Sequence, residues 1–221
     1  KDMASGHGEA MTGPMHIGFI PTVGPYILPK IVPHLKESFP ELELYLHEAQ
    51  THQLVSQLED GKLDCLVLAA GDETAVFKEI DVYDEPLSVA VPCDHEWAQQ
   101  DSVDMLQLNG QTVLALGDGH CLRDQAMGYC FSAGAEEDHS FRATSLETLR
   151  YMVASNMGIT LLPKLATLNP LSNKDIRYIP FSQPEPIREI SLLCRSGYAR
   201  MDCVRAVATS VRESVAPLFK G

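Results

Sequence analysis

Two cysteines, Cys121 and Cys130, have the surroundings of a reactive thiol pair. Cys121 follows the glycine-rich segment 116–119 where a helix is expected to begin, with His120 and Arg123 beside it. The exposed N–H groups and positive dipole end of a helix, together with neighbouring cations, favour a thiolate over a thiol. Cys121 is therefore the candidate nucleophile of the chain.

Cys130 lies at the far end of the same predicted helix. At about 100° and 1.5 Å per residue, it falls on the opposite face of the helix and about 13–14 Å further along the axis. A disulfide needs the two Cα atoms within about 7 Å of each other. A bond between Cys121 and Cys130 would therefore require the helix to unwind, which is the behaviour of a redox switch and not of a structural crosslink.

The residues alone leave other interpretations open. Cys121 and Cys130 can be two unrelated cysteines of one helix. A second interpretation is a zinc site gathered from His120, Cys121, Cys130, His139, Cys93 and His95. None of these six residues forms the closely spaced C-x2–4-C or H-x3–5-H pair that is typical of a zinc site, so we predict no metal and no cofactor. A third is a Cys–His nucleophile, which is disfavoured because adjacent side chains diverge and no orienting acid follows.

Composition limits the class of protein. The chain has 221 residues, 45% of them hydrophobic, which is enough for one or two domains with a real core. The sequence has no apolar run long enough to span a membrane. Seventeen basic and 30 acidic residues give a net charge of −13 without basic clusters, so the chain itself is a poor nucleic-acid binder. Six cysteines are too few for a disulfide scaffold and indicate a reducing, cytoplasmic compartment. Because the chain begins at Lys1, we expect residues 1–12 to be a linker or an expression remnant.

Strand and helix patterns alternate along the chain. The first set comprises a strand at 15–20, a helix at 22–38, a strand at 41–47, a helix from Thr51 to Gly61 and a strand at 63–69. The second set comprises strands at 86–91 and 111–116, a helix at 121–133, a strand at 139–143, a helix capped at Thr144–Ser145 and ending near Gly158, a strand at 159–162, extended structure at 187–193 and a helix at 200–218. This order predicts two α/β units, each with a parallel sheet covered by helices. Thr22 and Thr51 are expected to be helix N-caps.

Several segments resemble one protein family. They are 119–128 with Cys130, 141–150, 20–26, 47–54 and 158–163. On these segments the chain resembles the peroxide-sensing transcription activators of the LysR type, from about Gly13 to the last helix. The resemblance implies two Rossmann-like subdomains in the manner of periplasmic binding proteins. We expect subdomain I at 13–84 and 189–221, and subdomain II, which carries the redox cysteines, at 85–188.

The resemblance also implies a role for each site residue. Hydrogen peroxide would oxidise Cys121 to sulfenic acid, and Cys130 would then form a reversible disulfide with it, refolding the helix between them. The residues predicted to bind peroxide are Thr22, Thr51 and His120. The resemblance assigns stabilisation of the thiolate to Arg188. The local sequence adds Arg123 to that role, together with Asp124 as a first-turn partner of Arg123 or of the helix dipole. A cellular dithiol of the glutaredoxin or thioredoxin type would reduce the pair.

Regulators of this type carry a winged helix-turn-helix, which would precede residue 1. The resemblance therefore implies the regulatory half alone, which dimerises, forms a homotetramer at full length, and reaches DNA and RNA polymerase only as part of the whole regulator. Because peroxide is consumed once per cycle, we expect a sensor and not an enzyme. The alternatives are a LysR-type effector domain that binds a small organic metabolite, a thiol peroxidase and a free-standing solute-binding protein.

Overall fold

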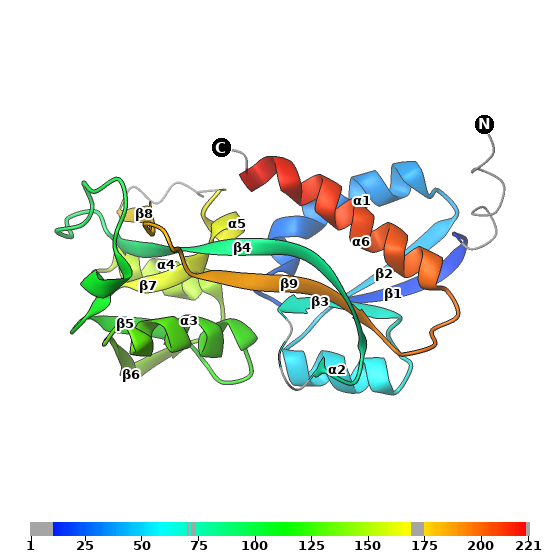
Figure 1. Cartoon of the computed structure of the whole chain (residues 1–221), viewed down its shortest axis with the longest axis horizontal. Coiled ribbons are helices and arrows are strands. Elements are labelled where there is room, and N and C mark those ends of the chain that lie inside the picture. Colours follow the sequence, from blue (N-terminus) through cyan, green and yellow to red (C-terminus); the bar gives the residue numbers. More distant parts are fainter. Residues whose placement is uncertain (1–10, 70, 72–73, 169–174, 220–221) are drawn as a thin grey trace. The chain divides into compact units, whose positions relative to one another are not determined.

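The chain folds into two compact units. The computed structural model describes residues 11–69, 71, 74–168 and 175–219. The first unit holds the described residues up to Tyr83 and from Glu189 onward, and the second unit is Asp84–Arg188. The chain enters the second unit within the long strand β4 (Lys78–Pro92) and leaves it within β9 (Ile187–Cys194) (Figure 1).

The sheet of the first unit has the order β2-β1-β3-β9. Strands β1 (Gly13–Phe19), β2 (Leu42–Glu48) and β3 (Cys65–Ala69) are parallel to one another, and β9 runs antiparallel to β3. The parallel arrangement predicted for the strands of residues 15–69 is therefore confirmed, and β9 is added to it antiparallel, because a strand that returns from the second unit can enter without a crossover helix. Every residue of β3 is buried, as expected for its continuous apolar sequence.

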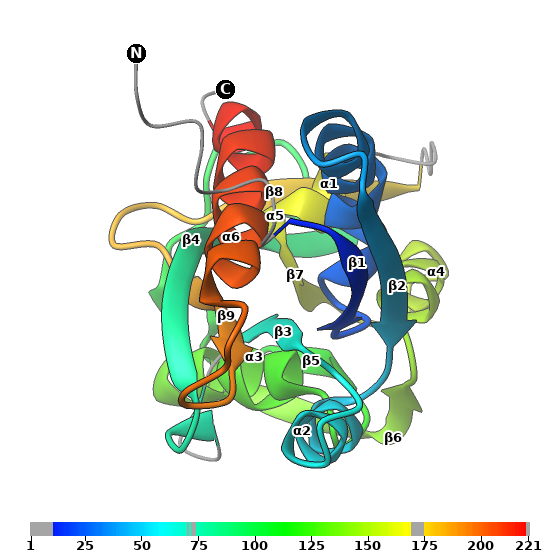
Figure 2. The same cartoon turned by 90° about the vertical axis from the view of Figure 1, so that its right-hand side faces the viewer.

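Three helices cover this sheet. Figures 1 and 2 show α1 (Gly24–Ser38) and α6 (Met201–Val215) on one face and α2 (Thr51–Glu59) on the other. In α1 the helical spacing of Ile27, Ile31 and Leu35 places all three in the core. Pro29 and Pro33 lie inside α1, where proline removes backbone hydrogen bonds, so burial of the apolar face of the helix outweighs that loss. The short 3-10 helix Ala216–Phe219 follows α6.

The second unit is built on two small sheets. Strands β7 (Thr160–Pro163) and β8 (Ile176–Pro180) each pair antiparallel with β4, while β5 (Thr112–Leu116) pairs parallel with β6 (Glu136–Ala143). The helices are α3 (Cys121–Ser132), α4 (Leu146–Ala154) and the short α5 (Lys164–Thr167), with a 3-10 helix at Met105–Leu108. Ser145 caps α4 as predicted, its hydroxyl accepting from the Thr148 N–H at 3.1 Å.

Some further elements of the structure were not expected from the sequence. Strand β8 was not predicted, because Arg177 and Pro180 interrupt its apolar residues, and helix α5 was not predicted, because four residues are too few to show helical periodicity. In the strand predicted at 41–47, the leucines at 42, 44 and 46 alternate along the chain, but only Leu42 is buried and Leu46 is exposed. Residues 1–10 of the expected linker lie outside the described residues. In the described part of the chain, no helix combines the length and apolar character that a membrane span requires.

Candidate functional site

Cys121 is the first residue of α3. Gly119 precedes it with φ +88°, a conformation that glycine adopts without strain, and this turns the chain from β5 into the helix. Among the described residues no side chain caps α3 in the manner of Ser or Asp, since the N-cap is His120. The first-turn N–H groups and the positive end of the helix dipole are therefore directed towards the start of α3, where the half-buried Cys121 thiol lies.

Cys130 lies on the same helix but is buried, whereas Cys121 is partly exposed. It is completely buried, with Leu122, Ala126 and Met127, on the face of α3 that packs on the sheet. Burial raises the pKa of the Cys130 thiol to about 12, so the group is protonated at neutral pH. Cys121 and Cys130 are not bridged, and the eight residues of intact helix between them hold the thiols on different faces.

His120 is buried beside the reactive thiol. Its side chain is 6% exposed, and burial lowers the pKa of the imidazole. The ring is therefore neutral near pH 7 and can donate or accept a hydrogen bond, but it does not supply the positive charge that the sequence suggested.

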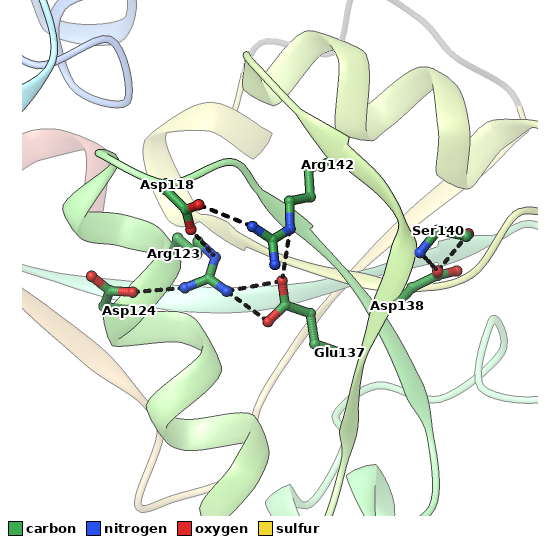
Figure 3. Close-up of polar contacts among 7 residues, drawn as sticks. All are labelled: Asp118, Arg123, Asp124, Glu137, Asp138, Ser140 and Arg142. Carbon is green, nitrogen blue, oxygen red and sulfur yellow. Dashed lines mark hydrogen bonds and ion pairs between the residues drawn. The ribbon is translucent and has the colours of Figure 1, made fainter.

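Arg123 is held by carboxylates. Figure 3 shows its guanidinium between Asp124 and Glu137: Nη1 donates to Asp124 Oδ1 at 3.0 Å, and Nη2 donates to both carboxylate oxygens of Glu137 at 3.0 and 2.7 Å. The hydrogen bond with Glu137 also raises the pKa of Arg123. Asp124 thus lies against Arg123, as the sequence suggested, and both side chains contribute to a carboxylate–guanidinium network.

Arg188 forms a buried ion pair with Glu85. Its Nε and Nη2 donate to Glu85 Oε2 at 2.9 and 2.7 Å, and the Leu165 N–H donates to Glu85 Oε1 at 2.9 Å. The two side chains are 1% and 0% exposed. Glu85 is a residue that sequence reasoning missed, and it fixes the plane and direction of the Arg188 guanidinium.

Thr22 and Thr51 are not the helix caps that the sequence predicted. The N-cap of α1 is Val23, and Thr51 is the first residue inside α2, after Gln50. Thr51 is 4% exposed, and its Oγ1 has no hydrogen-bond partner among the residues that the structure describes. A buried hydroxyl at a helix N-terminus without a protein partner is available to a small polar ligand. Both threonines belong to the first unit, whereas His120 and Cys121 belong to the second.

Residues 8–216, nearly the whole chain, match the LysR substrate-binding domain. The chain belongs to the LysR substrate-binding domain family. It is 53% identical, over all 221 residues and 73% of the relative's length, to a hydrogen peroxide-inducible genes activator of Haemophilus influenzae. It is also similar to the crystal structures of the oxidised and reduced forms of OxyR. Each has a TM-score of 0.87 over 96% of this chain and 100% of the other, at 52% and 49% identity.

These comparisons confirm the predicted LysR-type, periplasmic-binding-protein-like fold and the resemblance to peroxide-responsive regulators. The matched relatives are named as gene activators, so neither the thiol peroxidase nor the metabolite-binding alternative gains support. The redox roles of individual residues in this LysR substrate-binding domain stay predictions.

The four other cysteines of the LysR domain differ in burial. Cys65, Cys194 and Cys203 are buried, and burial raises the pKa of each thiol, which makes them unreactive. Cys93 is exposed and does not belong to the core. Among the described residues, no three His, Cys, Asp or Glu side chains are grouped as metal ligands.

A hydrogen bond at its end and a small cavity beneath it both affect how firmly α3 is held in this LysR domain. At its end, the Tyr129 hydroxyl donates to the Ile187 carbonyl at 2.8 Å. Beneath it lies a cavity of about 10 Å³, lined by Leu122, Ala126 and Met127 of α3 together with residues of β5, α4 and β7. Room for about one water molecule under a helix means incomplete packing, which lowers the cost of releasing that helix.

Proposed function

We propose that this chain is the hydrogen-peroxide sensor of a LysR-type transcription regulator, with Cys121 as the oxidised thiol. One observation carries the proposal: a half-exposed cysteine begins a helix that buries a second cysteine, in a chain 53% identical to a peroxide-inducible gene activator. The arrangement gives the two thiols unequal reactivity, which a stepwise reaction needs.

In the first step the Cys121 thiolate attacks one oxygen of hydrogen peroxide. The S–O bond forms as the O–O bond breaks, the sulfur is oxidised to sulfenic acid, and the departing hydroxide takes up a proton to become water. The α3 dipole favours the thiolate, and we propose Arg188, with Arg123 and Asp124 more indirectly, as the side chains that stabilise it. We propose Thr22, Thr51 and His120 as the groups that bind the peroxide.

In the second step Cys130 must reach Cys121. While α3 is intact, Cys130 is buried and protonated. Unwinding α3 exposes the thiol, which lets it ionise and attack the sulfenic sulfur. The S–S bond forms, the S–O bond breaks, and the hydroxyl leaves as water with the proton from Cys130. The disulfide must offset the lost packing of α3, so a cellular dithiol should reduce it readily.

The reaction would be transmitted by a change in the surface of the second unit. Unwinding α3 removes four buried residues from the core of the second unit and alters the surface on which copies of the chain pair. We propose that this changes the oligomer and, through it, DNA binding and contact with RNA polymerase by the whole regulator in the cytoplasm. Each peroxide is consumed once per cycle, so the chain acts as a sensor and not as an enzyme.

Trapping the intermediate tests this proposal. In Cys130→Ser the first step proceeds and the second cannot, so one equivalent of peroxide should leave a sulfenic acid at Cys121 that a dimedone-type probe labels. Peptide mass spectrometry identifies the labelled site. Labelling spread over several cysteines, or none at Cys121, would contradict the order of the two steps.

Thr51→Val tests the peroxide-binding role of the hydroxyl. Loss of one hydrogen bond to peroxide should slow oxidation of Cys121 about tenfold. The melting temperature should stay the same or rise, because a buried hydroxyl without a protein partner costs free energy. Thr209→Val, on the exposed face of α6, is the matched control and should change neither value. Stopped-flow oxidation and thermal unfolding measure the two effects, and an unchanged oxidation rate in Thr51→Val would remove Thr51 from the site.

A further inference from the structure

Glu137 is a buried carboxylate between two arginines. It lies on β6, its side chain is 3% exposed, and Figure 3 shows Arg123 and Arg142 directed towards it from α3 and from β6 itself. Arg123 is hydrogen-bonded to both of its oxygens, whereas Arg142 Nε is 3.8 Å from Oε1. The carboxylate is thus bound tightly to one cation and loosely to another.

The tight partner belongs to the helix that the proposed reaction unwinds. Arg123 is in the first turn of α3, two residues after Cys121. Asp118, in the segment that leads into α3, lies 3.6 Å from Arg123 Nε and 3.0 Å from Arg142 Nη1. Glu137 and Asp118 together fix the beginning of α3 to β6, so the first turn cannot move without parting the Arg123–Glu137 pair.

A buried carboxylate that loses its cation is costly, because its charge stays in a poorly solvated place. Arg142 is on the same strand as Glu137 and does not depend on α3. Its side chain is 40% exposed, so it has room to shorten its 3.8 Å contact when Arg123 departs. The two arginines therefore stabilise Glu137 in different states of the helix.

We propose that Glu137 is a positioning residue for the redox switch: through Arg123 it holds α3 in the dithiol form, and through Arg142 it remains paired when α3 unwinds. Glu137 touches neither sulfur in this role. It sets the equilibrium between dithiol and disulfide, and not the reactivity of Cys121. This inference rests on the proposed disulfide between Cys121 and Cys130.

The two partners of Glu137 give predictions of opposite sign. Glu137→Gln removes the charge that holds Arg123 in the dithiol form, so the ratio of disulfide to dithiol in a fixed glutathione buffer should rise about tenfold. Arg142→Gln removes the partner needed after unwinding, so the ratio should fall about threefold. Glu136→Gln makes the same chemical change at an exposed neighbour on β6 and should leave the ratio unchanged.

The measurement is the fraction of linked Cys121–Cys130 peptide after equilibration over a series of glutathione ratios. In a Cys130→Ser background, Glu137→Gln should also leave the rate of sulfenic acid formation unchanged. Equal ratios in Glu137→Gln and wild type, or shifts of the same sign in Glu137→Gln and Arg142→Gln, would overturn the inference, since a merely structural network would move both alike. If Glu137→Gln does not fold, the direction in which Arg142→Gln shifts the ratio of disulfide to dithiol decides the question. If the wild type forms no disulfide, it is the proposed function that fails.

Discussion

Cys121→Ser should abolish the disulfide and the conformational response to peroxide while leaving the domain folded. Cys130 cannot take over the reaction. With a pKa of about 12, only roughly one Cys130 thiol in 10⁵ is ionised at pH 7, and the group is buried under α3. Peroxide should therefore oxidise the remaining Cys130 thiol several orders of magnitude more slowly than it oxidises Cys121 in the wild type.

The conformational response is measured by intrinsic fluorescence or near-ultraviolet circular dichroism after peroxide is added to the reduced protein. Cys93→Ser is the matched control, because it removes an exposed thiol far along the sequence from α3 and should leave the response intact. A normal response in Cys121→Ser, or its loss in Cys93→Ser, would show that the reactive thiol has been assigned wrongly.

Glu85→Ala should be the most destabilising of the charge substitutions, lowering the free energy of unfolding of the reduced protein by about 3–5 kcal/mol. The change removes the carboxylate to which Arg188 Nε and Nη2 donate and also removes the acceptor of the Leu165 N–H. Because the site is fully buried, water does not replace the carboxylate at low cost.

Urea unfolding of the reduced protein measures this effect. The matched control is Asp60→Asn, which breaks an ion pair of nearly equal length, 2.8 Å to Lys62 Nζ, between side chains 52% and 67% exposed. The control should cost less than about 1 kcal/mol, because exposed pairs are screened by water. A loss in Glu85→Ala as small as that of the control would mean that the Arg188 guanidinium does not depend on Glu85.

Local patterns were sufficient to predict most elements of the fold. The apolar spacing in α1, the continuous apolar run of β3 and the Ser145 cap of α4 each reflect neighbours within a few residues. The antiparallel insertion of β9 beside β3 could not be predicted, because it depends on a chain that leaves for more than a hundred residues and returns. Periodicity says which face of a strand is apolar, but not which strand lies beside it.

Some residues of the candidate site could likewise be predicted from the sequence, and others could not. Cys121 could be identified from its own surroundings, since a helix start and its flanking residues are local in sequence. Glu85 and Glu137 could not, because their arginine partners are 103 and 14 residues away, and a lone glutamate in a strand carries no sign of burial. The cap predicted at Thr51 failed for a local reason: Gln50 takes the N-cap position, which leaves the Thr51 hydroxyl without that role.

The measurement that tests the central claim most directly is differential alkylation of the folded, reduced chain before and after one equivalent of hydrogen peroxide, read by peptide mass spectrometry. The redox-switch account predicts that Cys121 and Cys130 alone become protected and that their peptides are recovered linked to each other. If all six cysteines lose reactivity slowly and to similar extents, or if Cys121 is oxidised without ever linking to Cys130, the account is contradicted.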